Sequence, residues 1–126
     1  MKFLLTTLIL LAPSVASADV DCATALSDPD INECASRDFE RAETALNAAY
    51  KTLLADLKKM GTDIPDALEA RQKLIEAQRE WVKFRDSDCD AKFALNKGGT
   101  IRTLMYFSCM TSHAEQRTKE LVGFIE

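Results

Sequence analysis

The sequence has few of the residues from which catalytic and metal sites are built. Its 126 residues include one histidine, one tryptophan and four cysteines, and no two cysteines are spaced Cys-x-x-Cys. A nucleophile activated by histidine needs that ring held beside it, and His113 stands alone in a polar helical stretch. A zinc site needs several cysteine or histidine ligands. The residues therefore predict a protein that is not an enzyme and that has no catalytic, cofactor-binding or metal site.

Positive charges are outnumbered by negative ones, and glycine is scarce. There are 16 lysines and arginines against 20 aspartates and glutamates, which gives a formal net charge of −4. This balance argues against nucleic acid or an anionic membrane surface as a partner and is compatible with a cationic protein. Only four glycines are present, and Gly98-Gly99 lacks the further glycines of a phosphate-binding loop, so we interpret the pair as a turn.

Residues 1–18 have the pattern of a cleavable export signal. Lys2 supplies the positive end, residues 3–12 are apolar apart from two threonines, and Ala16-Ser17-Ala18 is a small-x-small cleavage site. The apolar run is far shorter than the roughly 20 residues that span a bilayer, and an uncleaved anchor is the alternative. We expect a periplasmic or secreted domain of residues 19–126. Its formal net charge is −5, because Lys2 is the only charged residue in the signal.

All four cysteines follow this signal, and an even number in a small exported chain predicts two disulfides. Three pairings are possible. We favour Cys22–Cys34 with Cys89–Cys109, because each pair brackets a local turn or helix junction. Loops of this length are worth about 3 kcal/mol each in the chain-entropy model.

Apolar residues recur at three- and four-residue steps in three segments, and each segment predicts a helix. The first runs from Pro29 to about Met60, the second from the turn at residues 62–66 to about Leu95, and the third from Ile101 to about Val122. The short connections imply antiparallel neighbours. The predicted fold class is all-α: a three-helix antiparallel bundle, with two long helices in a hairpin plus a third, stapled by two disulfides. Expected caps are Asp28 before Pro29 for the first helix, Thr62 or Asp63 for the second and Thr100 for the third, with a left-handed Gly61 ending the first.

The second helix carries the largest aromatic residues. Its predicted buried stripe is Ala67, Ala70, Leu74, Ala77, Trp81, Phe84, Ala91 and Leu95. Trp81 and Phe84 at this spacing are expected in the core, and a ligand cage is the alternative. Arg85 beside the stripe is expected to pair with Glu40 or Glu43, or else to face a partner. We treat Trp81, Phe84 and Arg85 as structural anchors.

The chain resembles the LprI-like lysozyme-inhibitor family of exported bacterial proteins. The segments that carry the resemblance are Asn32-Glu33-Cys34-Ala35, Ala45-Leu46-Asn47-Ala48-Ala49-Tyr50, Gln78-Arg79-Glu80-Trp81-Val82-Lys83-Phe84-Arg85-Asp86-Ser87-Asp88-Cys89, Gly98-Gly99-Thr100-Ile101 and Cys109. The resemblance covers nearly all of residues 19–126. It implies a periplasmic or surface-exposed protein whose activity is inhibition of lysozyme.

These observations give one leading functional hypothesis and two rivals. The leading one is an exported inhibitor of lysozyme or of a related, cationic peptidoglycan hydrolase. The rivals are a non-inhibitory adaptor of the cell envelope and, with less support, a small-molecule carrier. We expect docking at the end of the hairpin, where three aspartates approach the glycine turn, although helix solvation also explains them. The expected partner-binding residues are Asp86, Asp88, Asp90, Gly98 and Gly99.

Overall fold

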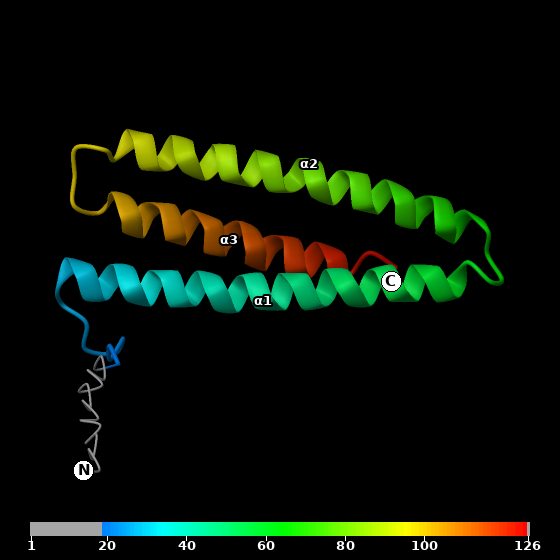
Figure 1. Ribbon diagram of the computed structural model, residues 1–126, viewed down its shortest axis with the longest axis horizontal. Helices are drawn as coiled ribbons and strands as arrows, with labels where there is room; N and C mark the ends of the chain where they lie inside the picture. The colour runs from blue at the N-terminus through cyan, green and yellow to red at the C-terminus, as the bar shows by residue number, and fades with distance from the viewer. Residues whose placement is uncertain (1–18, 126) are drawn as a thin grey trace, which may run out of the picture.

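The computed structural model describes residues 19–125, and within this range the chain forms three α-helices and no strand. They are α1 (Asp28–Met60), α2 (Asp66–Leu95) and α3 (Arg102–Val122). Successive helices run antiparallel, as Figure 1 shows. The all-α class and the three-helix bundle are confirmed. The predicted export signal, residues 1–18, lies outside the described residues.

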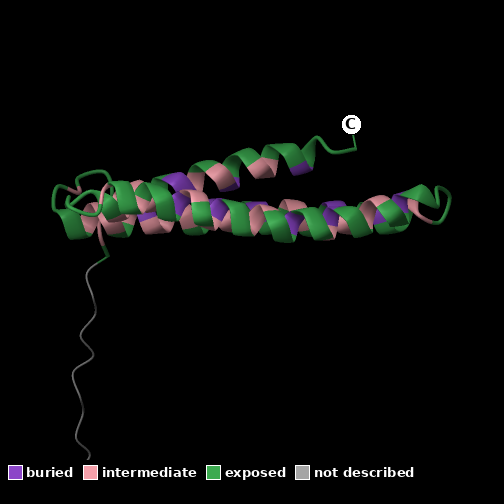
Figure 2. Cartoon of the chain, turned by 90° about the horizontal axis from the view of Figure 1, so that it is seen from above, coloured by how far each residue is buried: buried purple, intermediate pink, exposed green. Residues whose placement is uncertain are grey.

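The shortest helix holds the bundle together. With 21 residues, α3 is shorter than α1 at 33 and α2 at 30. It packs against both, most extensively against α1. In Figure 1 it runs between α1 and α2, and the view from above in Figure 2 shows that it lies to one side of them. Between residues 19 and 125, none of the helices combines the length and apolar character that a bilayer crossing requires.

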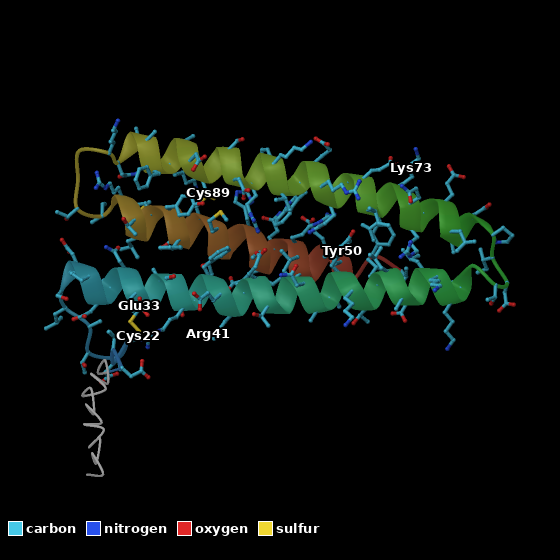
Figure 3. The ribbon with its side chains drawn as sticks, viewed as in Figure 1. Cys22, Glu33, Arg41, Tyr50, Lys73 and Cys89 are labelled. Atoms are coloured by element: carbon cyan, nitrogen blue, oxygen red, sulfur yellow. A yellow bond between two sulfur atoms is a disulfide. The ribbon has the colours of Figure 1, made fainter. Side chains whose placement is uncertain are left out.

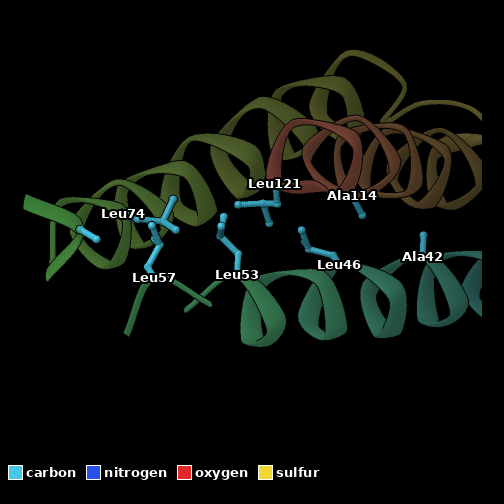
Figure 4. Close-up of a cluster of buried hydrophobic side chains, with 8 residues drawn as sticks. Ala42, Leu46, Leu53, Leu57, Leu74, Ala114 and Leu121 are labelled. Carbon is cyan, nitrogen blue, oxygen red and sulfur yellow. The ribbon is translucent and has the colours of Figure 1, made fainter. Parts of the chain in front are cut away.

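The main apolar core lies between α1, the first half of α2 and the second half of α3 (Figure 4). Leu46 and Leu121 are its most deeply buried leucines, at 1% and 2% exposure. The buried face of α1 changes from alanine to leucine along the helix. The complete buried cluster is Ala42, Leu46, Leu53, Leu57, Ala67, Leu74, Ala114 and Leu121.

Both predicted disulfides are present. Cys22–Cys34 ties the segment before α1 to the first turns of that helix, and Cys89–Cys109 joins α2 to α3. The second bridge is buried with Met110 in a small cluster of its own. Figure 3 shows Cys22 and Cys89 in the same half of the bundle. This half therefore contains both disulfides, whereas the opposite half is joined by the apolar core, by the turn between α1 and α2, and by a hydrogen bond from Arg71 Nε to the Leu54 carbonyl at 3.2 Å.

The helix ends differ from the sequence predictions. Ser27, not Asp28, caps α1: its Oγ accepts from the Asp30 N–H at 3.3 Å and donates to the Asp30 carboxylate at 2.7 Å. These two reciprocal hydrogen bonds resemble a capping box, and they involve the side chains of both Ser27 and Asp30. Gly61 is right-handed at φ −62°, so the left-handed cap was wrong.

The expected side-chain caps of α2 and α3 are also absent. Pro65 and Ile101 occupy the two N-cap positions, and neither has a side-chain cap hydrogen bond. At the start of α2, backbone bonds in the turn replace the cap, because Ala67 N–H donates to the Ile64 carbonyl and Leu68 N–H to the Pro65 carbonyl. The expected caps Thr62, Asp63 and Thr100 were wrong.

None of the four glycines has positive φ, which makes the glycine turn open to substitution. A Cβ added at Gly98 would meet nothing within 4 Å. Gly98→Ala should therefore raise the free energy of unfolding by about 0.4–1 kcal/mol, because alanine restricts the unfolded chain. Urea denaturation measures the change. Gly61→Ala is the matched control, since its Cβ would lie 2.4 Å from Leu68 Cδ2 and should remove the gain. A loss of stability in Gly98→Ala would contradict the described turn.

Candidate functional site

A buried arginine occupies the centre of the bundle. Arg85 on α2 is 5% exposed, and its Nη1 donates to Glu43 Oε2 of α1 at 2.8 Å. Its Nε donates to Asp86 Oδ1 at 3.0 Å. The guanidinium also lies over the rings of Trp81 and Phe39, at 5.1 and 5.9 Å from their centroids. The predicted pairing with Glu43 is therefore confirmed, and Arg85 joins α1 to α2 through both charge and aromatic contact.

A second arginine reaches the same tryptophan from α3. Arg117 lies 5.9 Å from the centroid of the Trp81 ring, and its Nε donates to Gln78 Oε1 at 3.0 Å. Its Nη1 pairs with Glu120 at 2.8 Å, and this hydrogen bond holds the pKa of the Glu120 carboxyl below its ordinary value. Trp81 is only partly buried, packed against the core rather than enclosed by it. Two arginine side chains therefore contact the Trp81 ring, Arg85 from α2 and Arg117 from α3.

Phe84 is not in the core, and that expectation was wrong. Its side chain is 60% exposed, with the ring edge-on to His113 at 5.7 Å between centroids. The buried residues of α2 are Ala67, Leu74, Gln78, Arg85 and Cys89. Two of these positions are polar, so the stripe of apolar residues and the buried stripe diverge after Leu74. Ala77, Phe84, Ala91 and Leu95 all lie outside the buried set.

The three aspartates predicted to form a docking surface lie in three different environments. Asp86 pairs with Arg85, and Asp88 Oδ2 lies 2.9 Å from His113 Nε2. Asp90 is exposed. The pKa of the Tyr106 phenol is raised, first by burial and then by the negative charges of Asp90 and Asp86. The aspartates are thus partly engaged within the bundle, and Asp90 is the one most open to a partner.

The glycine turn is flanked by positive charge, whereas the docking surface expected at this end of the hairpin was acidic. Gly98 and Gly99 are exposed, as predicted for a turn. However, the turn is flanked by Lys92, Lys97 and Arg102, and residues 91–102 contain no acidic residue. A cationic partner would be repelled there rather than attracted.

Negative charge is concentrated instead in residues 19–43, which we call the acidic segment. It holds eight aspartates and glutamates against two arginines, for a formal charge of −6, whereas residues 44–125 hold 11 acidic and 13 basic residues, for +2. The two arginines are both paired within the segment, Arg37 with Asp19 and Glu33 and Arg41 with Asp38. The acidic segment includes the first disulfide and the first four turns of α1.

The family of the chain follows from a match over most of its length. The family model described as "Lysozyme inhibitor LprI" matches residues 21–121, which include both disulfides, the Arg85–Glu43 pair and all of α1 and α2. The chain belongs to the LprI lysozyme inhibitor family. The resemblance predicted from the sequence is confirmed.

One curated relative of this LprI chain is informative about the extent of the likeness. It is similar to uncharacterized protein R02472 of Rhizobium meliloti (strain 1021), at 31% identity over 113 residues, which is 84% of this chain and 79% of the relative. No solved structure matches the chain. The family is an inhibitor family, and its description connects the chain to lysozyme.

Proposed function

We propose that this protein is an exported inhibitor of lysozyme or of a related peptidoglycan hydrolase, acting by binding and not by catalysis. Membership in the LprI family supports the class of activity. The observation that carries the mechanism is the charge distribution: the acidic segment holds −6 while residues 44–125 hold +2. Such a separation of charge directs one end of the molecule toward a cationic partner.

The structure suits this role at the acidic end. Complementary charge mainly increases the association rate, because it steers the encounter over several ångströms. Cys22–Cys34 and Cys89–Cys109 both lie in this half of the bundle, so the segment before α1 is fixed to α1, and α2 is fixed to α3, before binding. A surface that is ordered in advance loses less conformational entropy on docking. We propose that the acidic segment docks on the target, and that exposed Asp90 of α2 contributes to the same surface.

A lysis assay with purified residues 19–126 tests the proposal against a panel of lysozymes. We expect inhibition that weakens as salt rises, because exposed charges more than about 8–10 Å apart are screened at physiological ionic strength. Asp28→Asn with Glu40→Gln should slow association about three- to tenfold at low salt and change dissociation less. Both side chains are exposed and have no ion-pair partner in the described residues.

Asp56→Asn with Glu69→Gln is the matched control. It removes the same charge from exposed helical positions in the opposite half and should leave association nearly unchanged. Equal effects of the two double variants would show that net charge alone acts, and would reject the acidic segment as the docking surface. Asp90→Asn separately tests the end of the hairpin. If no lysozyme in the panel is inhibited, the inhibitor proposal fails and the envelope-adaptor hypothesis replaces it.

A further inference from the structure

Four potential metal ligands meet where α2 packs on α3. They are Asp88 and Cys89 of α2 and Cys109 and His113 of α3, and their ligand atoms all lie within 4.8 Å of one another. His113 Nε2 is 2.9 Å from Asp88 Oδ2, and Cys109 Sγ is 3.8 Å from the same oxygen. In the disulfide, Cys109 carries no proton, so this second approach is a contact and not a hydrogen bond. The group cannot be recognised from sequence spacing, because its members are up to 25 residues apart.

The donor set is one that zinc prefers once the two sulfurs are thiolates. Zinc in proteins takes thiolate, imidazole and carboxylate ligands in tetrahedral geometry, at about 2.0–2.3 Å. Those bond lengths place neighbouring ligand atoms about 3.3–3.8 Å apart. The His113–Asp88 and Cys109–Asp88 separations are within about half an ångström of this range. The widest separation in the group, up to 4.8 Å, would have to shorten by about 1 Å, which is within the reach of side-chain rotation. The two sulfurs are bonded to each other in the oxidised chain and would move apart after reduction.

One side of the group is buried in the bundle, and the other side is exposed to solvent. Cys89 and Cys109 are 0% and 4% exposed, whereas the side chains of His113 and Asp88 are 22% and 40% exposed. An ion could enter past the histidine and the carboxylate and reach the thiolates behind them. The edge-on rings of Trp81 and Phe84, with centroids 6.5 and 5.7 Å from that of His113, restrict the orientation of the imidazole.

We propose that, in the reduced protein, Asp88, Cys89, Cys109 and His113 form a four-ligand Zn²⁺ site, so that a disulfide and a metal ion are alternative cross-links between α2 and α3. The reductant is a dithiol. Its two thiols are oxidised to a disulfide, two electrons break the Cys89–Cys109 bond, and each sulfur takes up one proton. Zn²⁺ binding then releases both thiol protons to solvent, and the imidazole binds through the nitrogen that now faces Asp88.

Anaerobic titration with Co²⁺ tests the site, because tetrahedral cobalt thiolates have intense visible and charge-transfer absorption. The protein is residues 19–126 with Cys22→Ser and Cys34→Ser, which leaves one pair of sulfurs, reduced by a dithiol that is then removed. We expect one Co²⁺ per chain with thiolate bands, displacement by Zn²⁺, and no such bands for the oxidised protein. His113→Ala should weaken binding at least about tenfold, and Ser112→Ala, an exposed neighbour on α3, should not.

Several outcomes would overturn the proposal. One is Co²⁺ binding without thiolate bands, and another is an unchanged affinity when His113→Ala and Asp88→Asn are combined. Circular dichroism covers the case in which reduction unfolds the bundle. Recovery of helix on addition of Zn²⁺ would support the site, and a reduced chain that stays unfolded at saturating Zn²⁺ would reject it.

Discussion

Arg85→Ala is expected to lower the free energy of unfolding by about 3 kcal/mol, as measured by urea denaturation. Removing one partner of a buried ion pair typically costs about 3–5 kcal/mol. The lower end applies here because the Glu43 and Asp86 side chains are 30% and 48% exposed, so water can solvate them once the guanidinium is gone. The variant also loses the contact of the guanidinium with the Trp81 ring and leaves space in the core.

Two further substitutions separate the causes of this loss. Arg85→Met keeps most of the volume without the charge, so it should recover part of the stability if packing dominates. Lys83→Ala, two positions away, is the control. It pairs only with exposed Glu80 and should change stability by less than about 0.5 kcal/mol. An Arg85→Ala variant as stable as the Lys83→Ala variant would show that the central arginine contributes no net stability.

Replacing Cys89 and Cys109 together with alanine is expected to cost about 3 kcal/mol in metal-free buffer. The bridge closes a loop of 20 residues, for which the chain-entropy model gives about that value. Both sulfurs are buried, so the native helices keep their positions and most of the entropy is gained by the unfolded chain.

The other disulfide gives the comparison. The Cys22→Ala, Cys34→Ala variant should lose less, about 1 kcal/mol or under, although the chain-entropy model gives its 12-residue loop only slightly less than the 20-residue loop. Residues 19–27 are mostly exposed, so the segment gains freedom in the native state as well as in the unfolded one. Differential scanning calorimetry of both double variants would measure the ranking. An equal loss would mean that the segment before α1 packs more firmly than its exposure indicates.

How far the sequence predicts the fold differs between the two long helices. In α1 every buried residue is apolar, and these residues follow one another at steps of four and seven, as helical periodicity predicts: Ala35, Ala42, Leu46, Leu53 and Leu57. In α2 the buried positions include Gln78 and Arg85, and a pattern of apolar residues cannot identify a buried polar one. Hydrophobic periodicity therefore placed Phe84 in the core, one residue away from the position that is buried. Polar groups that satisfy one another across helices are recognisable only once the helices are paired.

The contacts of the candidate site also differ in how far the sequence predicts them. The pairing of Arg85 with Glu43 was expected, because the hairpin brings those parts of the first two helices together. The contact of His113 with Asp88 depends on the register of α3 against α2. That register is set by Cys89–Cys109, and His113 lies one helical turn beyond Cys109. The predicted disulfide therefore held a signal for this contact that periodicity alone did not reveal.

The position of the single tryptophan gives the protein an intrinsic optical reporter. The guanidinium groups of Arg85 and Arg117 both lie over the indole ring of Trp81, and the imidazole of His113 is edge-on to it. These three neighbours come from α2 and α3, and Arg85 is itself fixed by α1. Any separation of the helices therefore alters the polarity and quenching around one fluorophore. Emission from the unlabelled protein can follow unfolding, reduction of Cys89–Cys109 and ion binding at His113 in a single cuvette.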